Sequence, residues 1–388
     1  MIPSRNKKKG VVGLDIEASS IAATELCVNG GVRIGGYGIA PLDAGVFRDG
    51  EVHEPDGLSE SLKELFSANK LPKDVRLGVA NQRVVVRTLQ LPLIEDQDEL
   101  EAAIRFQAQD HIPMPLDQAV LDWQVIPAAA GAEVPTLEVV VVAARRDMLK
   151  KAIGAVKGAG LRLVGIDHSA FALIRALAGE HPPMHAGGFA DPGPEFDPMA
   201  DPAELQQTAE VVADPSADPT IGVPEMGRLY CNLGDVTNLA VARGDFCLFT
   251  RVFNFGIEGI AQSLAERSGL TLDHARQWLI HVGLEADVGS IEGDAEIVTA
   301  TRDALAAGTA KLGDELRRSL EYYAALEGAV RVESVVIAGA GTMIPGLVEH
   351  LRRELPLPID AATPSALAGV AGRAAARLTL SYGLGLEE

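Results

Sequence analysis

The sequence of 388 residues is poor in aromatic residues, in cysteine and in positive charge. Phe, Trp and Tyr supply 4% of the residues, so the core is expected to consist mainly of Val, Leu, Ile and Ala. Three cysteines without C-x-x-C spacing argue against both a disulfide framework and a zinc site. Lys and Arg number 34 against 54 Asp and Glu, and the net charge of −20 repels the phosphates of nucleic acids. We therefore expect no nucleic acid partner.

Long apolar runs are missing as well. The longest aliphatic stretch, residues 139–144, is far shorter than the ~20 residues that a membrane-spanning helix needs. The basic N-terminus leads into a strand-like segment at residues 11–16, not into the apolar region of a signal peptide. These features predict a cytoplasmic protein. A hydrophobic content of 47% and this length suit two to four folding units with a sizeable core.

One segment of the chain contains no Lys or Arg. It lies between Arg175 and Arg228, and nine of the 22 prolines fall in it. Its apolar residues follow neither a period of 2 nor one of 3.6, so residues 181–227 are predicted to be a disordered Pro/Asp-rich linker. The linker would separate a first lobe at residues 10–180 from a second lobe at residues 228–388. A passive insertion and an acidic interaction segment are alternative roles for it.

The two lobes begin with similar patterns. The first opens with VVGLDIEASSIAATELCVNGGVRIGGYGI and the second with RLYCNLGDVTNLAVARGDFCLFTRVFNFG. In each, a strand ends at an acid or amide (Asp15, Asn232), and a polar turn, a second strand, a Gly-containing turn and a third strand follow. Elsewhere, strands alternate with helical patterns, which indicates an α/β protein. The expected helices cover residues 57–69, 97–110, 146–159, 170–177 (with Ser169 as its cap), 257–267, 273–282, 297–327 and 343–354.

The repeated halves and a late glycine turn resemble the actin, Hsp70 and sugar-kinase superfamily. Within it the chain is similar to the PilM family of type IV pilus assembly proteins, which is related to FtsA. The segments GLDIEASSIAATEL, AIRFQAQDHIPMPLDQAVLDWQVI, LRLVGIDHSAFALIRAL, ELRRSLEYYAALEG and VIAGAGTMIPGL carry the likeness. It implies an α/β, actin-like two-lobed fold with duplicated ribonuclease H-like halves. It also implies an FtsA-type subdomain inserted at about 76–160 and a small subdomain of the second lobe at about 257–327.

The resemblance implies an ATP site in the cleft between the lobes, in which Asp15 would hold Mg²⁺ through water. Two positions depart from the family pattern. Glu17 stands where relatives carry Gly, and its carboxylate would repel a polyphosphate, while Asn232 replaces an Asp. We expect a degenerate site without catalytic residues; ATP with Mg²⁺ bound weakly and no nucleotide at all are the alternatives. The implied cofactor-binding residues are Asp15, Glu17, Ser19, Asn232, Gly234, Thr237, Gly339, Gly341 and Thr342.

By resemblance, the protein is expected to be a cytoplasmic scaffold or adaptor of type IV pilus assembly, held at the inner membrane by its partners. The implied partner is the cytoplasmic tail of a PilN-like inner-membrane protein. The pilus assembly ATPase and self-association into a ring or filament are further implied contacts. The competing hypothesis is an active ATP-dependent enzyme, an ATPase or kinase. Such an enzyme needs an intact phosphate cradle, and Glu17 and Asn232 argue against it.

The resemblance also implies where the partner tail lies: in a groove between the first core subdomain and the inserted one. Its walls are expected from the strand at residues 83–87 and a helix around residues 104–109. Alternation along the strand would send Val84 and Val86 to one face and Arg87 to the other. Phe106 as an ordinary core residue is the alternative for that position. The implied partner-binding residues are Val84, Val86, Arg87, Arg105, Phe106 and Gln109.

Overall fold

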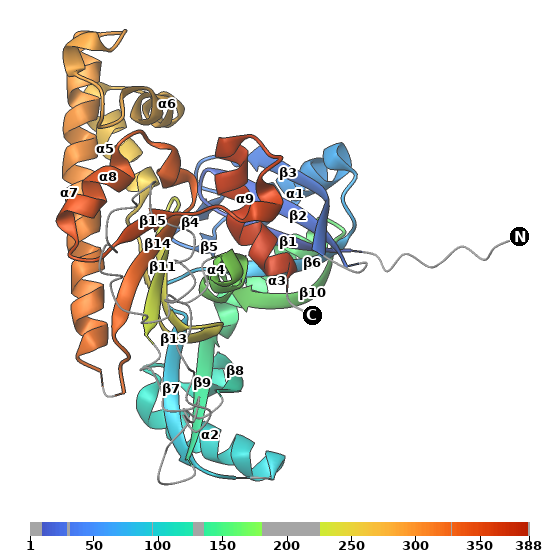
Figure 1. Cartoon of the computed structure of the whole chain (residues 1–388). Helices are drawn as coiled ribbons and strands as arrows, with labels where there is room; N and C mark the ends of the chain where they lie inside the picture. The colour runs from blue at the N-terminus through green and yellow to red at the C-terminus, as the bar shows by residue number, and fades with distance from the viewer. Residues whose placement is uncertain are drawn as a thin grey trace, which may run out of the picture.

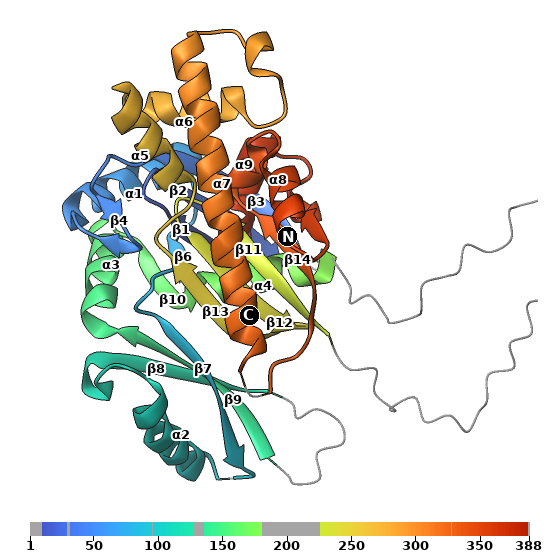
Figure 2. The same ribbon diagram turned by 90° about the vertical axis from the view of Figure 1, so that its left-hand side faces the viewer.

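The computed structural model describes residues 10–28, 32–94, 96–126, 136–180, 226–326 and 328–386. All but the last two residues of the linker predicted at 181–227 lie outside these ranges, and so does the turn at 29–31. The described residues form two lobes, each around a five-stranded sheet, with a three-stranded sheet below them (Figures 1 and 2). The predicted two-lobed α/β architecture is thus observed.

The sheet of the first lobe has the strand order β10-β6-β1-β2-β3. The first three strands form the antiparallel meander expected from the sequence, whereas β6 and β10 run parallel to β1. Helices α1 and α3 pack together beside this sheet, because their Leu and Ala side chains form one core with the strands. The elements are β1 (Val11–Ile16), β2 (Ser20–Val28), β3 (Val32–Pro41), β4 (Phe47–Arg48), β5 (Glu51–Val52), α1 (Pro55–Asn69), β6 (Asp74–Val79), α3 (Arg146–Gly158) and β10 (Arg162–His168).

The second lobe repeats this plan with the strand order β13-β12-β11-β14-β15. Its meander pairs Leu233 with Thr237 across the first turn, as β1 and β2 pair Ile16 with Ile21 in the first lobe. The long helix α7 runs along one side of the molecule and packs against α5, α6 and α8 (Figure 1). The elements are β11 (Gly227–Leu233), β12 (Thr237–Arg243), β13 (Phe246–Phe253), α5 (Ile257–Ser268), α6 (Leu272–Val282), η3 (Val288–Ser290), α7 (Ala295–Ala324), β14 (Val332–Ala338), η4 (Ala340–Met343), α8 (Leu347–Glu354), β15 (Ile359–Ala361) and η5 (Ser365–Leu367).

Two helices lie between the sheets: α4 (Ser169–Leu177), which leads into η2 (Ala178–Glu180), and the final helix α9 (Gly372–Gly385). Helix α9 packs against β1, β2, β6 and α4 and therefore belongs to the first lobe (Figure 1). The core around these helices also includes Tyr230 and Ala240 of the second lobe. Because α9 packs on the strands of the first lobe, we propose that the second lobe ends before α9 and not at residue 388.

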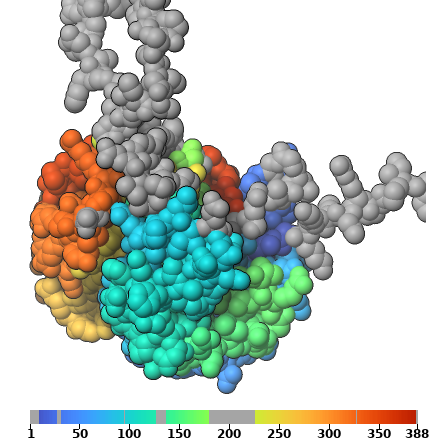
Figure 3. All heavy atoms as spheres, turned by 90° about the horizontal axis from the view of Figure 1, so that it is seen from below, coloured from blue at the N-terminus to red at the C-terminus, as the bar shows by residue number. Residues whose placement is uncertain are grey.

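The inserted subdomain is a sheet in the order β7-β9-β8 with helix α2 on one face. Seen from below, it covers the centre of the molecule (Figure 3). Because β6 belongs to the first-lobe sheet and α3 packs on α1, we propose narrower limits for this subdomain than about 76–160, with residues 85–145 at its centre. Its elements are β7 (Val85–Pro92), α2 (Gln97–His111), η1 (Leu116–Gln118), β8 (Ala119–Ile126) and β9 (Thr136–Arg145).

No helix in the described parts of the chain is long and apolar enough to cross a bilayer.

Candidate functional site

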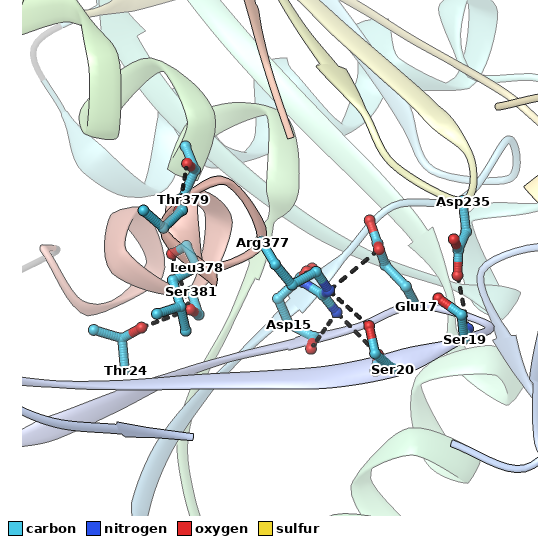
Figure 4. Close-up of polar contacts among 11 residues, drawn as sticks. Asp15, Glu17, Ser19, Ser20, Thr24, Asp235, Arg377, Leu378, Thr379 and Ser381 are labelled. Carbon is cyan, nitrogen blue, oxygen red and sulfur yellow. Dashed lines mark hydrogen bonds and ion pairs between the residues drawn. The ribbon is translucent and has the colours of Figure 1, made fainter. Parts of the chain in front are cut away.

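The first turns of the two meanders face each other across the cleft between the lobes. The β1–β2 turn is closed by a hydrogen bond from the Glu17 backbone N–H to the Ser20 carbonyl, at 2.9 Å. The backbone N–H of Ser19 donates to Asp235 Oδ2 in the β11–β12 turn, at 2.7 Å (Figure 4). This bond joins residues 216 positions apart and ties the two lobes together at the bottom of the cleft.

Arg377 of α9 occupies the centre of this site (Figure 4). Its guanidinium forms an ion pair with Asp15 and a second one with Glu17, the latter at 3.3 Å between Nε and Oε2. It also donates to the Ser20 hydroxyl at 2.8 Å and to the Ser20 carbonyl at 2.9 Å. The side chains of Arg377, Asp15 and Glu17 are all at most 8% exposed. A resident arginine therefore offsets part of the negative charge of Asp15 and Glu17.

Burial controls the ionisation of these acids. It raises the pKa of Glu17 to about 8; Arg377 opposes the rise, and the negative charges of Asp235 and Asp15 add to it. The pKa of Asp15 is raised by the same burial, against the attraction of Arg377. A charge is costly inside a protein unless it is paired. One cation is shared by two buried carboxyl groups here, so one of them readily holds a proton near neutral pH.

Glu17 fills the space next to Gly234. A Cβ added at Gly234 would lie 2.0 Å from Glu17 Oε1, so a larger residue there would displace the Glu17 carboxylate. The carboxylate of Glu17 also accepts a hydrogen bond from the backbone of Asp235. Within the described ranges, no group of three or more His, Cys, Asp or Glu side chains is arranged to hold a metal ion. The space where the family resemblance expects the phosphates is therefore occupied by the protein's own carboxylate and arginine, Glu17 and Arg377.

The other expected nucleotide-binding residues are used within the second lobe. Thr237 is fully buried and donates its hydroxyl hydrogen bond to the Phe255 carbonyl, at 2.7 Å. Gly339 has a φ of +92°, and a Cβ there would lie 2.5 Å from Asn232 Oδ1, so the turn needs glycine for packing. Thr342 closes the same turn by donating to the Gly339 carbonyl, at 2.8 Å. Asn232 lines the cleft cavity, whose walls do not include Gly339, Gly341 or Thr342.

A larger hollow, which we call the groove, separates the inserted sheet from α4. It measures about 710 Å³ and touches all three parts of the molecule. Val120 of β8 and Val142 of β9 form one wall, Phe171 of α4 the second, and Phe246 of β13 the third. His168 also lines it. Its Nδ1 accepts from the Ala170 backbone N–H and caps α4, whereas its Nε2 is buried without a partner among the described residues.

The structure divides the six expected partner-binding residues between two faces of the inserted sheet. Val84 lines the groove, and Val86 is buried beside it in contact with Ile126 and Val140. Helix α2 packs on the opposite face, through Ile104 and Ala108. Its exposed side chains therefore point away from the groove. Helix α2 carries three of the expected residues, Arg105, Phe106 (71% exposed) and Gln109. The remaining one, Arg87 of β7, donates a hydrogen bond to the carbonyl of the preceding residue, Val86.

Two residues of the cleft, Asp235 and Arg377, are absent from the set expected from the sequence. Arg377 stands in a helix that otherwise buries small and apolar side chains, and an arginine at such a position needs a buried carboxylate partner. That signal was present in the sequence. It did not indicate which acid would be the partner, and Asp15 lies 362 positions away.

Comparisons with known proteins agree on one family and one fold. A family model described as "Type IV pilus assembly protein PilM" matches residues 13–187 and 205–381. A solved PilM-PilN type IV pilus biogenesis complex contains a chain that matches with a TM-score of 0.72 at 24% identity, over 97% of this chain and 98% of that chain. MreB5 of Spiroplasma citri bound to AMPPNP matches with a TM-score of 0.52 at 12% identity, over 97% and 95% of the two chains. The actin-like two-lobed fold is thereby confirmed.

Proposed function

Since this chain belongs to the family of the type IV pilus assembly protein PilM, we propose that it is an actin-like adaptor that binds the cytoplasmic tail of a PilN-like membrane protein. Through this partner it would reside on the cytoplasmic side of the inner membrane. The observation that carries the proposal is the groove of about 710 Å³ between the inserted sheet and α4.

The walls of the groove suit an extended peptide with apolar side chains. Val120, which is 40% exposed, and Phe171 offer apolar surface to such side chains. The unpartnered Nε2–H of His168 is a donor for a peptide carbonyl, because the Nδ1 atom of the same ring already accepts from Ala170. Burial lowers the pKa of His168 to about 4, so the ring stays neutral at pH 7. A short Leu- or Pro-containing tail would fit this combination.

Strand β8 adds a second means of recognition. It lies at the edge of the inserted sheet and pairs only with β9 among the described residues, so the backbone groups along its outer side can pair with an added strand. We therefore place the partner tail against β8 and α4. The exposed face of α2, with Arg105, Phe106 and Gln109, is the second candidate surface, and the titration described below distinguishes the two.

We also propose that the cleft does not hydrolyse ATP. Phosphoryl transfer needs a metal-bound polyphosphate and a free carboxylate or water-positioning group. Asp15 and Glu17 are both paired with Arg377, and Glu17 stands against Gly234 where the turn would approach a phosphate. An adaptor without turnover agrees better with this arrangement than an ATPase or a kinase does.

The partner site is tested by titrating the fluorescently labelled cytoplasmic tail of the PilN-like protein against three variants and measuring anisotropy. Val120→Asp places a charge in the groove and should weaken binding at least tenfold, which is about 1.4 kcal/mol. Val125→Asp is the matched control, because Val125 is equally exposed on the same strand but does not line the groove. Phe106→Ala probes α2 and should bind within twofold of the parent. If Phe106→Ala weakens binding of the tail and Val120→Asp does not, the tail binds on α2.

A further inference from the structure

The cleft contains an inner cavity that none of the interactions above explains. It measures about 240 Å³, which is below the roughly 300–1,000 Å³ of pockets for drug-sized ligands. The β1–β2 turn with Glu17 and the β11–β12 turn with Asp235 form its floor, and the β4–β5 hairpin and the start of α5 form its roof. A more open hollow of about 410 Å³ adjoins it and shares Phe47, Arg48 and Gln262 with it.

The walls of this cavity are acidic. Five carboxyl groups line it, and three arginines are placed to offset them: Arg48 in the wall, Arg377 beside Asp15, and Arg276 beside Glu258. With every group ionised, five negative charges against three positive ones leave a surplus of two. Asp49 and Asp235 form no ion pair among the residues that the structure describes. The carboxyl groups are those of Asp15, Glu17, Asp49, Asp235 and Glu258.

Two buried polar side chains in the same walls have no partner. Asn238 of β12 is 1% exposed, and neither its amide nitrogen nor its amide oxygen is hydrogen-bonded within the described structure. The same holds for the hydroxyl of Ser169, also 1% exposed, at the start of α4. Both line the cavity. A buried polar atom without a partner costs about 1–3 kcal/mol, so such atoms mark places where a ligand or water completes the hydrogen bonds.

We propose that this cavity binds a small aliphatic diamine. Ammonium groups donate hydrogen bonds, and the cavity offers acceptors: the carboxylate of Asp235, the amide oxygen of Asn238 and the hydroxyl of Ser169. Two ammonium groups match the surplus of two negative charges, and the ring of Phe47 in the wall can face an alkyl chain or a cation. A nucleoside triphosphate is negatively charged, unlike a diamine, so the acidic walls of the cavity repel it.

The charge on the ligand would also be coupled to Glu17. At pH 7 this carboxyl is largely protonated, since burial raises its pKa to about 8 and Asp235 and Asp15 add to that rise against Arg377. A cation in the cavity favours the ionised form, so binding should release protons at pH 7. The site would then respond to both amine concentration and pH, in a protein whose two lobes meet at Asp235.

The test is isothermal titration calorimetry of the full chain with 1,4-diaminobutane, with 1,4-butanediol as the uncharged analogue of the same length. We expect saturable one-site binding of the diamine, release of protons when two buffers of different ionisation enthalpy are compared, and no binding of the diol. Asp235→Asn keeps an oxygen acceptor for the backbone N–H of Ser19 and removes the negative charge. It should weaken binding of the diamine at least tenfold. Glu321→Gln, at an exposed position of α7, gives the same net charge and should bind like the parent.

A second variant separates binding from folding. Asn238→Leu removes the unpartnered amide and should bind the diamine at least tenfold more weakly while unfolding at the same or a higher temperature. Equal binding by Asp235→Asn and Glu321→Gln would mean that diamines only collect on the acidic surface, and the proposal would fail. It would fail as well if the diol bound as tightly as the diamine, or if ATP with Mg²⁺ bound and the diamine did not.

Discussion

Replacing Arg377 by Met removes the cation from the cleft while keeping most of the side-chain volume. Arg377 is 8% exposed and pairs with Asp15 and Glu17, and breaking a buried pair by removing one partner costs about 3–5 kcal/mol. The protein can lower this cost by protonating a carboxyl. Protonating a carboxyl group whose usual pKa is near 4 costs about 1.4 kcal/mol for each pH unit above that pKa, or about 4 kcal/mol at pH 7. The loss of stability caused by each unpaired acid therefore cannot exceed about 4 kcal/mol. We therefore expect a loss of about 3–5 kcal/mol at pH 7 and a smaller loss at pH 5.

The assay is urea unfolding followed by far-UV circular dichroism, with Arg373→Met as the control. Arg373 is exposed one turn earlier on the same helix, so its replacement should change the free energy of unfolding by less than about 0.5 kcal/mol. Adding Asp15→Asn and Glu17→Gln to Arg377→Met removes the unpaired charges and should restore much of the loss. If Arg377→Met costs less than about 1 kcal/mol, or the triple variant is no more stable than the single one, the ion-pair cluster does not stabilise the first lobe as described.

Four further predictions concern pH and nucleotide. Because the pKa of Glu17 is about 8 in the folded chain and 4.5 ordinarily, the folded state binds more protons, so stability should fall as pH rises from 6.5 to 8; Glu17→Gln should flatten this decline in urea unfolding. Burial shifts the pKa of His168 in the opposite direction, from 6.5 to about 4, so the folded state binds fewer protons at this residue than the unfolded state. The free energy of unfolding should therefore decrease as pH falls below 6.5, by about 1–2 kcal/mol down to pH 5. His168→Asn keeps a cap for α4 and should remove that decrease. The native protein should turn over ATP far more slowly than the roughly 1 s⁻¹ of an ordinary ATPase. Glu17→Gly with Asn232→Asp should bind ATP with Mg²⁺ at least tenfold more tightly than the parent in calorimetry, because it removes a repelling carboxylate and leaves Asp15 as the only carboxylate paired with Arg377 among the described residues; equal affinity would contradict the proposed role of Glu17.

Local patterns predicted much of the fold. The apolar run at residues 332–338 is bounded by polar residues on one side and a glycine turn on the other, which is typical of a buried strand, and it forms β14. The repeated opening of the lobes predicted both meanders, and the registers at Ile16–Ile21 and Leu233–Thr237 confirm the matching turns. Alternation and turn chemistry act between neighbours in sequence, so a single sequence is sufficient to reveal them.

Contacts between distant segments were not predictable in the same way. Ser169 was expected to cap α4, but the structure uses the His168 ring, because β10 places it directly over the Ala170 N–H. The sequence pattern of α2 does not show which side of the inserted sheet the helix covers, so residues of β7 and residues of α2 were expected in the walls of one groove. Arg377 and Asp15 are 362 positions apart, and only the return of α9 to the first lobe brings them together.

Hydrogen–deuterium exchange with and without the cytoplasmic tail of the PilN-like protein tests most directly whether this protein binds its partner in the groove. The tail should slow exchange in β8, at residues 119–126, and at the β10–α4 junction, at residues 166–171, because both line the groove. Exchange in α2, at residues 97–111, should not change. Slower exchange confined to α2, or no change at β8 under saturating tail, would contradict the proposed adaptor site.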